Sequence, residues 1–183
     1  MKNKKIRWAI VGLGLQGEKI AAAIDASRHG CIAAVASHDK NHAQKFSKRH
    51  GAITHASYQT LLKDRTIDAI AICSANHEHA RHAMLALQAG KHILCEKPMT
   101  LSRRDAKALV SEAKKRHAIV GVGFHLRHHP LMKRTRAMIE SGTLGTIRLI
   151  EMNWSVGQHG EATLQPLNRF MQWREDPKKA GGG

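Results

Sequence analysis

A glycine-rich loop near the N-terminus has the composition of a phosphate-binding turn. Residues 12–17 read GLGLQG and match the pattern G-x-G-x-x-G. In such a loop Gly12 permits a tight turn, Gly14 lets the backbone approach a pyrophosphate, and Gly17 lets the following helix pack closely. Because a helix N-terminus offers amide hydrogens and a favourable dipole, we expect dinucleotide phosphates here rather than a turn that binds nothing. The residues expected to contact the cofactor here are Gly12, Leu13, Gly14, Gln16 and Gly17.

The residue expected to meet the adenosine ribose is a serine. An acidic residue about 20 positions after the glycine loop would normally bind the ribose 2′-hydroxyl of NAD. This sequence has Ser37 there, followed by His38, with Lys40 close by. A serine carries no charge that repels a 2′-phosphate, and the neighbouring basic groups attract one. We therefore predict NADP in preference to NAD; the alternative is that Asp39 restores NAD binding.

A lysine whose side chain can stabilise charge or exchange a proton follows a short apolar run, in the tripeptide Glu96-Lys97-Pro98. Open α/β sheets bind their ligands at the carboxyl ends of their strands, which is where this turn would lie. A cation there can stabilise a developing alkoxide while hydride leaves carbon, and a lysine can also exchange protons. On its own, the tripeptide is better explained as a surface turn with a solvated lysine. The residues around it must therefore decide between a surface turn and a catalytic lysine.

The elements that would position these residues alternate between apolar runs and amphipathic helical stretches. This alternation is typical of βαβ units and a parallel sheet. We therefore predict an α/β fold with a doubly wound Rossmann sheet in residues 1–124. The predicted strands are approximately Ile6–Val11, Cys31–Ala36, Ile67–Cys73, His92–Cys95 and Val120–Phe124. Helices are predicted between them, with stops at Gly51 and Gly90 and a start at Ser102, where Asp105 completes the pattern of a capping box.

Residues 125–183 are predicted to be the beginning of a second, incomplete α/β domain. A helix would start at Pro130 and end at Gly142, and a strand would run from Ile147 to about Trp154. That strand has apolar side chains on both faces, and neither face has an evident cover. We therefore predict an exposed edge that promotes self-association.

Composition restricts the other classes of function. The chain has 183 residues, 42% of them hydrophobic, and no apolar run long enough for a bilayer, so we expect a cytoplasmic globular protein. The net charge of +16 is scattered and aromatic residues are only 4%, which predicts a solvated basic surface without specific nucleic-acid binding. Three widely spaced cysteines predict buried free thiols. No metal is predicted, because no cysteine pair or carboxylate cluster completes a zinc-like spacing with either of two histidine sets, namely His77, His79 and His82 or His125, His128 and His129.

Several further motifs occur in order along the chain. From GLGLQG through AGKHILCEKPM, GVGFHLRHHP and SGTLGTIRLIE, the sequence resembles the glucose-fructose oxidoreductase, inositol dehydrogenase and MocA family throughout its length. The resemblance implies homo-oligomers that exchange hydride between NAD(P) and a sugar, polyol or related compound. It assigns Lys97 a catalytic or substrate-orienting role and gives Glu96 and Pro98 the task of shaping the cofactor pocket. It also implies that the residues near the nicotinamide ribose include Ser74, Asn76 and His79.

One departure from the family affects the expected activity. The family's D-x-G-x-H signature, whose histidine serves with the lysine in proton transfer, would follow the segment WREDPKKAGGG and lies outside the 183 residues. For this chain as written, we therefore expect nucleotide binding with little or no turnover. A non-catalytic nucleotide-binding module and an anion or nucleic-acid binder remain the alternatives.

Overall fold

The computed structural model describes residues 4–37, 39–153 and 172–181 of the chain. The chain forms two compact units, one of residues 1–123 with 169–183 and one of residues 124–168. The segment 172–181, which we expected in the second domain, thus packs with the first unit. The assignment of residues 125–183 to one second domain stays a prediction.

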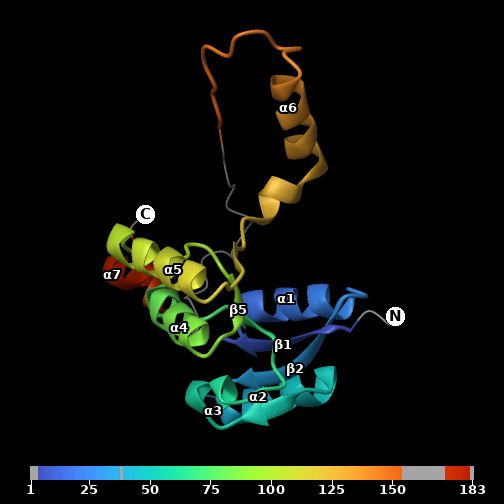
Figure 1. Cartoon of the computed structure of the whole chain (residues 1–183), viewed down its shortest axis with the longest axis vertical. Helices are drawn as coiled ribbons and strands as arrows, with labels where there is room; N and C mark the ends of the chain where they lie inside the picture. Colours follow the sequence, from blue (N-terminus) through green and yellow to red (C-terminus); the bar gives the residue numbers. More distant parts are fainter. Residues whose placement is uncertain (1–3, 38, 154–171, 182–183) are drawn as a thin grey trace, which may run out of the picture. The chain divides into compact units, whose positions relative to one another are not determined.

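The first unit is built on a six-stranded parallel sheet in the order β3-β2-β1-β4-β5-β6 (Figure 1). The strands are β1 (Ile6–Val11), β2 (Gly30–Ala36), β3 (Ile53–His55), β4 (Ala69–Ile72), β5 (His92–Cys95) and β6 (Val120–Val122). The helices between them are α1 (Leu15–Asp25), α2 (Lys40–His50), α3 (Tyr58–Leu62), α4 (Asn76–Gln88) and α5 (Arg103–Lys115). This order is that of a doubly wound dinucleotide-binding fold, so the predicted fold class is confirmed.

Two apolar layers hold the sheet between its helices. Along β1, Ile10 contributes to the layer under α1 and α2, whereas Ala9 and Val11 contribute to the layer under α3, α4 and α5. Alternation of this kind follows from the two-residue repeat of a strand whose two faces are both covered. The sheet is therefore buried on both sides, and its strand ends are left for ligands.

Strand β3 is an element that the sequence did not predict. It has only three residues, and Ile53 is 57% exposed. A short edge strand with one solvated apolar side chain does not produce the apolar run that identifies buried strands. These three residues form a strand because they pair with Ala34, Val35 and Ala36 of β2.

Most predicted helix ends are confirmed. Gly51 and Gly90 adopt the left-handed conformation, with φ of +65° and +72°, which glycine reaches without a Cβ penalty. The Ser102 side chain accepts a hydrogen bond from the Asp105 amide at 3.1 Å. The Asp105 carboxylate instead forms an ion pair with Arg104 at 3.3 Å. The serine half of the predicted capping box is therefore confirmed, and the aspartate half is not.

The second unit contains a 3₁₀ turn, η1 (His125–His128), and a helix, α6 (Pro130–Glu140). Pro130 occupies the first turn of α6, as predicted, and Gly142 follows the helix with φ of +73°. The strand predicted from Ile147 is wrong for the described residues 147–153, which form no strand. A strand needs a neighbour to pair its backbone groups, and no described segment of this unit supplies one. Trp154, the predicted end of that strand, lies outside the described residues.

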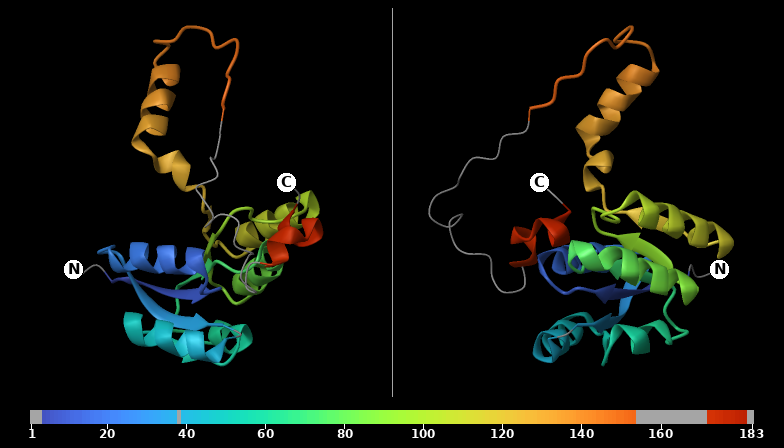
Figure 2. Two further views of the ribbon diagram at one scale, coloured as in Figure 1. Left: turned by 180° about the vertical axis from the view of Figure 1, so that it is seen from behind. Right: turned by 90° about the vertical axis from the view of Figure 1, so that its left-hand side faces the viewer.

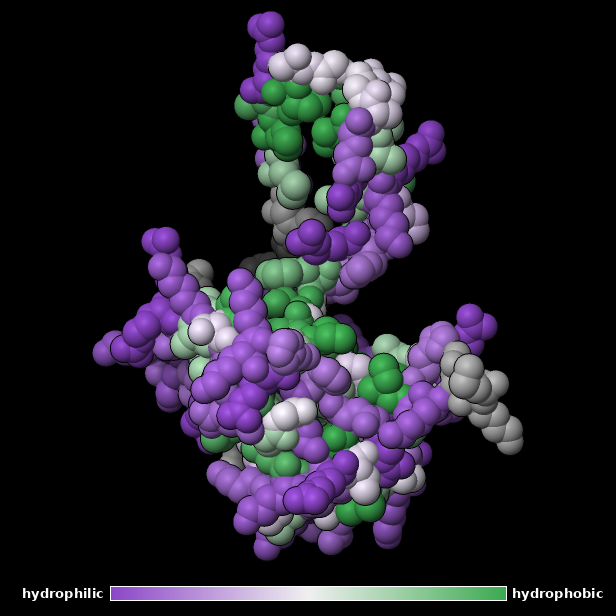
Figure 3. Space-filling view, viewed as in Figure 1, coloured by the Kyte–Doolittle hydropathy of each residue, from purple (hydrophilic) through white to green (hydrophobic). Residues whose placement is uncertain are grey.

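The segment 147–153 exposes the apolar side chains that the sequence pattern marked. Leu149, Ile150 and Met152 are 76%, 69% and 77% exposed, and Figure 3 shows hydrophobic surface on this unit. We predict concentration-dependent self-association, because exposed apolar surface and unpaired backbone groups favour pairing between chains. Replacing Leu149 and Ile150 together by lysine should shift the protein toward the monomer in size-exclusion chromatography. A clean monomer of the unaltered chain at high concentration would contradict this prediction.

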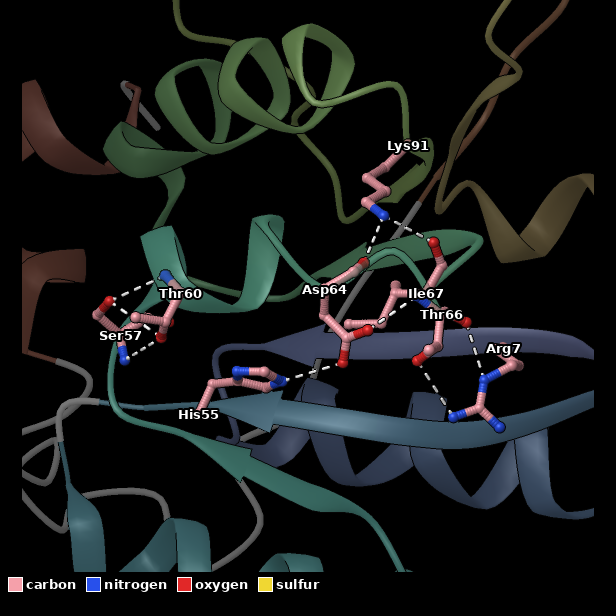
Figure 4. A network of polar contacts seen from close by, with 8 residues as sticks. All are labelled: Arg7, His55, Ser57, Thr60, Asp64, Thr66, Ile67 and Lys91. Carbon is pink, nitrogen blue, oxygen red and sulfur yellow. Dashed lines mark hydrogen bonds and ion pairs between the residues drawn. The ribbon is translucent and has the colours of Figure 1, made fainter.

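A polar network ties together the turn that precedes β4 and the elements around it (Figure 4). The buried Lys91 ammonium donates hydrogen bonds to the carbonyl oxygens of Asp64 and Ile67, at 2.7 and 2.9 Å. Burial lowers the pKa of Lys91. Arg7 donates from Nε to the carbonyl oxygen of Thr66 at 2.8 Å. The turn before β4 is thus tied to β1 and to the residue that precedes β5.

Asp64 in this network gives a pH-dependent stability prediction. Hydrogen bonds from the side chain and the backbone amide of Thr66 hold the pKa of Asp64 below its ordinary value of 3.8, and His55 adds to the effect. A carboxyl with a lower pKa in the folded state stabilises the fold above the unfolded pKa and loses that contribution as the pH falls below it. Asp64→Asn should therefore lower the free energy of unfolding by about 1 kcal/mol at pH 7.

Urea denaturation at pH 7 and at about pH 3 checks this prediction. The difference between Asp64→Asn and the unaltered chain should shrink at the lower pH, because the carboxyl of the unfolded chain is then protonated and the ionised form contributes less. An equal difference in the free energy of unfolding at both pH values would show that ionisation of the Asp64 carboxyl contributes nothing to stability.

Among the described residues, none of the helices combines the length and apolar character that crossing a bilayer requires.

Candidate functional site

Gly12 directly follows β1 and has a backbone conformation that only glycine adopts readily. Its φ is +86°, and a Cβ built there would lie 2.4 Å from both the Cys73 carbonyl carbon and the Ser74 nitrogen. The predicted tight turn is confirmed. The close approach to Cys73 and Ser74, which follow β4, is a second constraint that the sequence did not show, because those residues are distant along the chain.

The other two glycines of the loop differ in their surroundings. A Cβ at Gly17, in the first turn of α1, would lie 2.3 Å from the Gly12 carbonyl oxygen, so the predicted close packing is confirmed. Gly14 is the N-cap of α1, and a Cβ there would meet nothing within 4 Å. Among the described residues, no side chain caps this helix. The first-turn amide hydrogens are therefore available to solvent or to an anion.

The remaining loop residues take different positions. The Leu13 side chain is 3% exposed and belongs to the layer under α1 and α2, so only its backbone is available to a ligand. Gln16 is partly exposed in the first turn of α1. The Leu13 side chain thus anchors the loop that the glycines shape.

Ser37 directly follows β2, where the sequence placed the ribose contact. Its Oγ accepts a hydrogen bond from the Asp39 amide at 3.2 Å. The Asp39 carboxylate caps α2 by accepting from the His42 amide at 2.9 Å. Asp39 therefore has a local structural task, which accounts for an acidic residue in this segment without a role in NAD binding. His38, which we also predicted to meet the ribose, lies outside the described residues.

Lys97 lies exposed in the turn after β5. Its backbone amide donates to Oε2 of Glu96 at 3.2 Å. The Glu96 carboxyl group occupies the space beside Gly123, where a Cβ would approach Oε1 to 3.1 Å. Gly123 in turn donates from its amide to the Cys95 carbonyl oxygen at 2.8 Å. Gly123 was not singled out from the sequence; the repeated glycines of GVG were the available signal.

Burial disfavours ionisation of the two thiols near this turn. Burial, with a further contribution from the negative charge of Glu96, raises the pKa of both Cys73 and Cys95 to about 12. A thiol rather than a thiolate is therefore present at neutral pH, and thiols are poor nucleophiles. All three cysteines are free, as predicted, but only Cys95 is buried; the predicted burial is wrong for Cys31 and Cys73, which are partly exposed.

The three residues expected near the nicotinamide ribose lie at the start of α4 and just before it, in different environments. The Ser74 hydroxyl lies 2.9 Å from Nδ1 of His82. The Asn76 amide donates from Nδ2 to the Ala180 carbonyl oxygen at 2.8 Å. His79 is 1% exposed, and its ring lies in the protein interior. Ser74, after β4, and Asn76, at the start of α4, are partly exposed, whereas the His79 side chain is buried.

His82 belongs to a polar cluster that the sequence did not reveal. Its carbonyl oxygen accepts from the Tyr58 hydroxyl at 2.7 Å, and its Nε2 lies 3.5 Å from Oε2 of Glu78. Burial raises the pKa of Tyr58. The i,i+4 spacing of Glu78 and His82 was a signal for this contact. Within the described ranges, His, Cys, Asp and Glu side chains form no group of three that could hold a metal.

The short helix α7 (Pro177–Ala180) lies beside α4 (Figure 2). The bond from Asn76 joins the two helices. A Cβ at Gly181 would reach 2.5 Å from Cδ2 of Leu101, so the end of this segment packs closely. A segment 104 residues away along the chain from Asn76 therefore borders the candidate site.

The strand order brings these residues to one edge. β1 pairs with β4, and β4 pairs with β5, all in parallel, so the residues after these strands share the carboxyl edge of the sheet. The order reverses between β1 and β4, where open α/β sheets bind ligands. The glycine loop, Ser74 and Lys97 therefore border one region at the switch point.

Residues 6–124 match the profile of an oxidoreductase family described by its NAD-binding Rossmann fold, that of the glucose-fructose oxidoreductase, inositol dehydrogenase and MocA proteins. The chain belongs to this family. The match confirms the predicted family resemblance. The family consists of oxidoreductases with an NAD-binding fold, so the predicted enzyme class and type of cofactor are confirmed at the level of the family.

Individual oxidoreductases are similar to this chain in sequence or in structure. The trans-1,2-dihydrobenzene-1,2-diol dehydrogenase of Macaca fuscata fuscata is 31% identical over 97% of this chain and 51% of its own length. The D-xylose 1-dehydrogenase (NADP(+)) of Hypocrea jecorina is 28% identical over 85% of this chain and 43% of its own length. The 3-ketoreductase KijD10 of Actinomadura kijaniata, solved with NADP and TDP-benzene, superposes with a TM-score of 0.72 at 29% identity, covering 76% of this chain and 43% of that one.

The chain spans about half the length of the curated relatives that it matches. The matched family region, residues 6–124, contains the glycine loop, Ser37, Ser74 and Lys97. The oxidoreductase signature therefore lies in the first structural unit, where the candidate site has been described.

Proposed function

We propose that this chain binds NADP and forms the nucleotide-binding part of an oxidoreductase that moves hydride between the nicotinamide and a sugar, polyol or related small molecule. The observation that supports the proposal most is the packing of Gly12 against the backbone of Cys73 and Ser74. This packing brings an uncapped helix N-terminus to the switch point of the sheet. Such a site suits a diphosphate, which needs amide donors and close backbone approach.

The residues of this edge fit the parts of a dinucleotide. The amides of residues 14–17 would bind the pyrophosphate, and Ser37 would meet the adenosine ribose. Ser74 and Asn76 would border the nicotinamide ribose, with His79 beneath them. When bound, the nicotinamide ring supplies or accepts the hydride. Lys97 would face the reacting carbon, where its ammonium group stabilises negative charge on the substrate oxygen.

Several observations favour NADP over NAD. Ser37 has no carboxylate to repel a 2′-phosphate, and the Asp39 carboxylate caps α2. Lys40 lies in the first turn of α2, and its positive charge would attract a 2′-phosphate. The similar xylose dehydrogenase is named for NADP(+), and the similar ketoreductase was solved with NADP.

Calorimetry with the purified chain tests the proposal. We expect saturable binding of NADPH, about tenfold tighter than binding of NADH, a difference of about 1.4 kcal/mol. Gly14→Ala is the matched variant, because its Cβ meets no protein atom within 4 Å and would collide only with a bound pyrophosphate. Loss of binding in a normally folded Gly14→Ala supports the site. Absence of binding for both cofactors to the unaltered chain contradicts the proposal, and tighter binding of NADH contradicts its NADP part.

Oxidation of NADPH in the presence of a panel of keto-sugars separates the enzyme from its alternative. Substrate-dependent oxidation that Lys97→Ala removes supports hydride transfer. Tight NADPH binding without any oxidation, which we expect of this chain as written, supports only the nucleotide-binding part of the proposal.

A further inference from the structure

The buried ring of His79 joins two backbone carbonyl groups that belong to different strand ends. Its Nε2 lies 2.9 Å from the carbonyl oxygen of Ser74, which follows β4. Its Nδ1 lies 2.7 Å from the carbonyl oxygen of Pro98, which follows β5. With 1% of its surface exposed, His79 is shielded from direct contact with a ligand. We call this pair of contacts the carbonyl brace.

The chemistry of the ring defines what the brace requires. A carbonyl oxygen only accepts hydrogen bonds, so a ring nitrogen that carries hydrogen donates to the carbonyl oxygen that it faces. Both ring nitrogens lie within hydrogen-bond distance of a carbonyl oxygen, and the rigid ring sets the separation of the two strand ends. A glutamine at this position has its donors on one nitrogen and can satisfy one carbonyl, but not both in this geometry.

The brace lies on a continuous path between the glycine loop and the lysine turn. Gly12 packs against the Ser74 nitrogen, His79 holds the Ser74 carbonyl, and the same ring holds Pro98, the residue after Lys97. The ladder between β4 and β5 extends as far as the bond from the Glu96 amide to the Ile72 carbonyl at 2.9 Å. The His79 bond fastens the turn beyond that point.

We propose that His79 is a positioning residue that fixes the Lys97 turn relative to the glycine loop through the carbonyl brace. The proposal rests on the proposed function, in which Lys97 faces the nicotinamide of a dinucleotide held by that loop. Removing the brace leaves two carbonyl groups with a poorer partner and frees the turn to move. Lys97 would then lose its alignment with the bound cofactor.

A double-mutant cycle on NADPH affinity tests the coupling. We expect His79→Gln to weaken NADPH binding about tenfold, and Lys97→Ala to weaken it several-fold in the unaltered chain. In the His79→Gln background, Lys97→Ala should change the affinity by less than about twofold, because the lysine is already displaced. Equal effects of Lys97→Ala in both backgrounds, including no effect in either, would overturn the proposal.

His82→Gln is the matched control. His82 is also a buried histidine of α4, 5% exposed, but its ring contacts the Ser74 hydroxyl rather than the two carbonyls. The full effect of Lys97→Ala should persist in this background. Loss of that effect here would show that any disturbance of α4 uncouples Lys97, and would count against a specific role of His79.

Hydrogen exchange on the chain without cofactor keeps this inference separate from the proposed function. His79→Gln should show faster exchange at residues 96–99 with unchanged protection in the middle of α4. Unchanged exchange at residues 96–99 overturns the brace even where NADPH binds. Failure of the unaltered chain to bind NADPH, with faster exchange in His79→Gln, contradicts the proposed function alone.

Discussion

Gly12→Ala is expected to remove NADPH binding and to destabilise the first unit. The new Cβ would lie 2.4 Å from the Cys73 carbonyl carbon and the Ser74 nitrogen, and these backbone atoms cannot move aside as a flexible side chain could. The residue would also have to keep a φ of +86°, which costs an alanine about 1–2 kcal/mol. With overpacking of about 1–3 kcal/mol, the free energy of unfolding should fall by about 2–5 kcal/mol.

Thermal unfolding and calorimetry with NADPH measure the two effects of Gly12→Ala separately. Gly14→Ala is the control, because a Cβ at Gly14 meets no protein atom within 4 Å and the residue has an ordinary φ of −73°. An alanine N-cap should lower the free energy of unfolding by no more than about 1 kcal/mol, so this variant should lose the cofactor but little stability. If both variants proved equally stable, the close packing of Gly12 on the end of β4 would be wrong.

Ser37→Asp is expected to reverse the cofactor preference. A carboxylate next to the adenosine ribose accepts a hydrogen bond from the 2′-hydroxyl of NADH and repels the 2′-phosphate of NADPH. Two like charges near a protein surface repel by up to about 4 kcal/mol at about 4 Å, and solvent reduces this value. We expect NADPH affinity to fall about 30-fold, equivalent to about 2 kcal/mol, and NADH affinity to rise several-fold.

Calorimetry with both cofactors checks the reversal, and Ser37→Ala provides the control. Alanine removes the hydroxyl that accepts from the Asp39 amide but introduces no charge, so NADPH should remain the tighter ligand. If Ser37→Asp leaves the ratio of the two affinities unchanged, Ser37 does not face the 2′-position. The preference for NADP would then need another origin.

Gly12 and Ser37 lie at different ends of the same site. Gly12 packs against the backbone that follows β4, whereas Ser37 leaves the end of β2 without a carboxylate at that position. Both residues were identifiable from sequence, since a glycine loop after an apolar run and the next strand end have fixed spacing in a βαβ unit. The physical reason for Gly12 was only partly visible, because its contact with Ser74 joins residues that are not neighbours in the chain.

Sequence reasoning failed where pairing depends on partners elsewhere. It missed β3, whose three residues become a strand only through the register with β2. It predicted a strand from Ile147, whose alternating apolar side chains are real but whose backbone has no described partner in its unit. A two-residue repeat reports which faces are apolar, and it does not report whether a neighbouring strand exists.

The sequence alone determined the sheet-and-helix alternation, the glycine loop, the helix stops and the position of Lys97, because these depend on local backbone geometry and on short-range periodicity. Tertiary structure alone decided that the ring of His79 lies between Ser74 and Pro98, and that the Glu96 carboxyl lies against Gly123. His79 and Pro98 are 19 residues apart. They meet because parallel pairing of β4 with β5 brings both strand ends to one edge, and a buried ring must satisfy its polar atoms with whatever that edge provides.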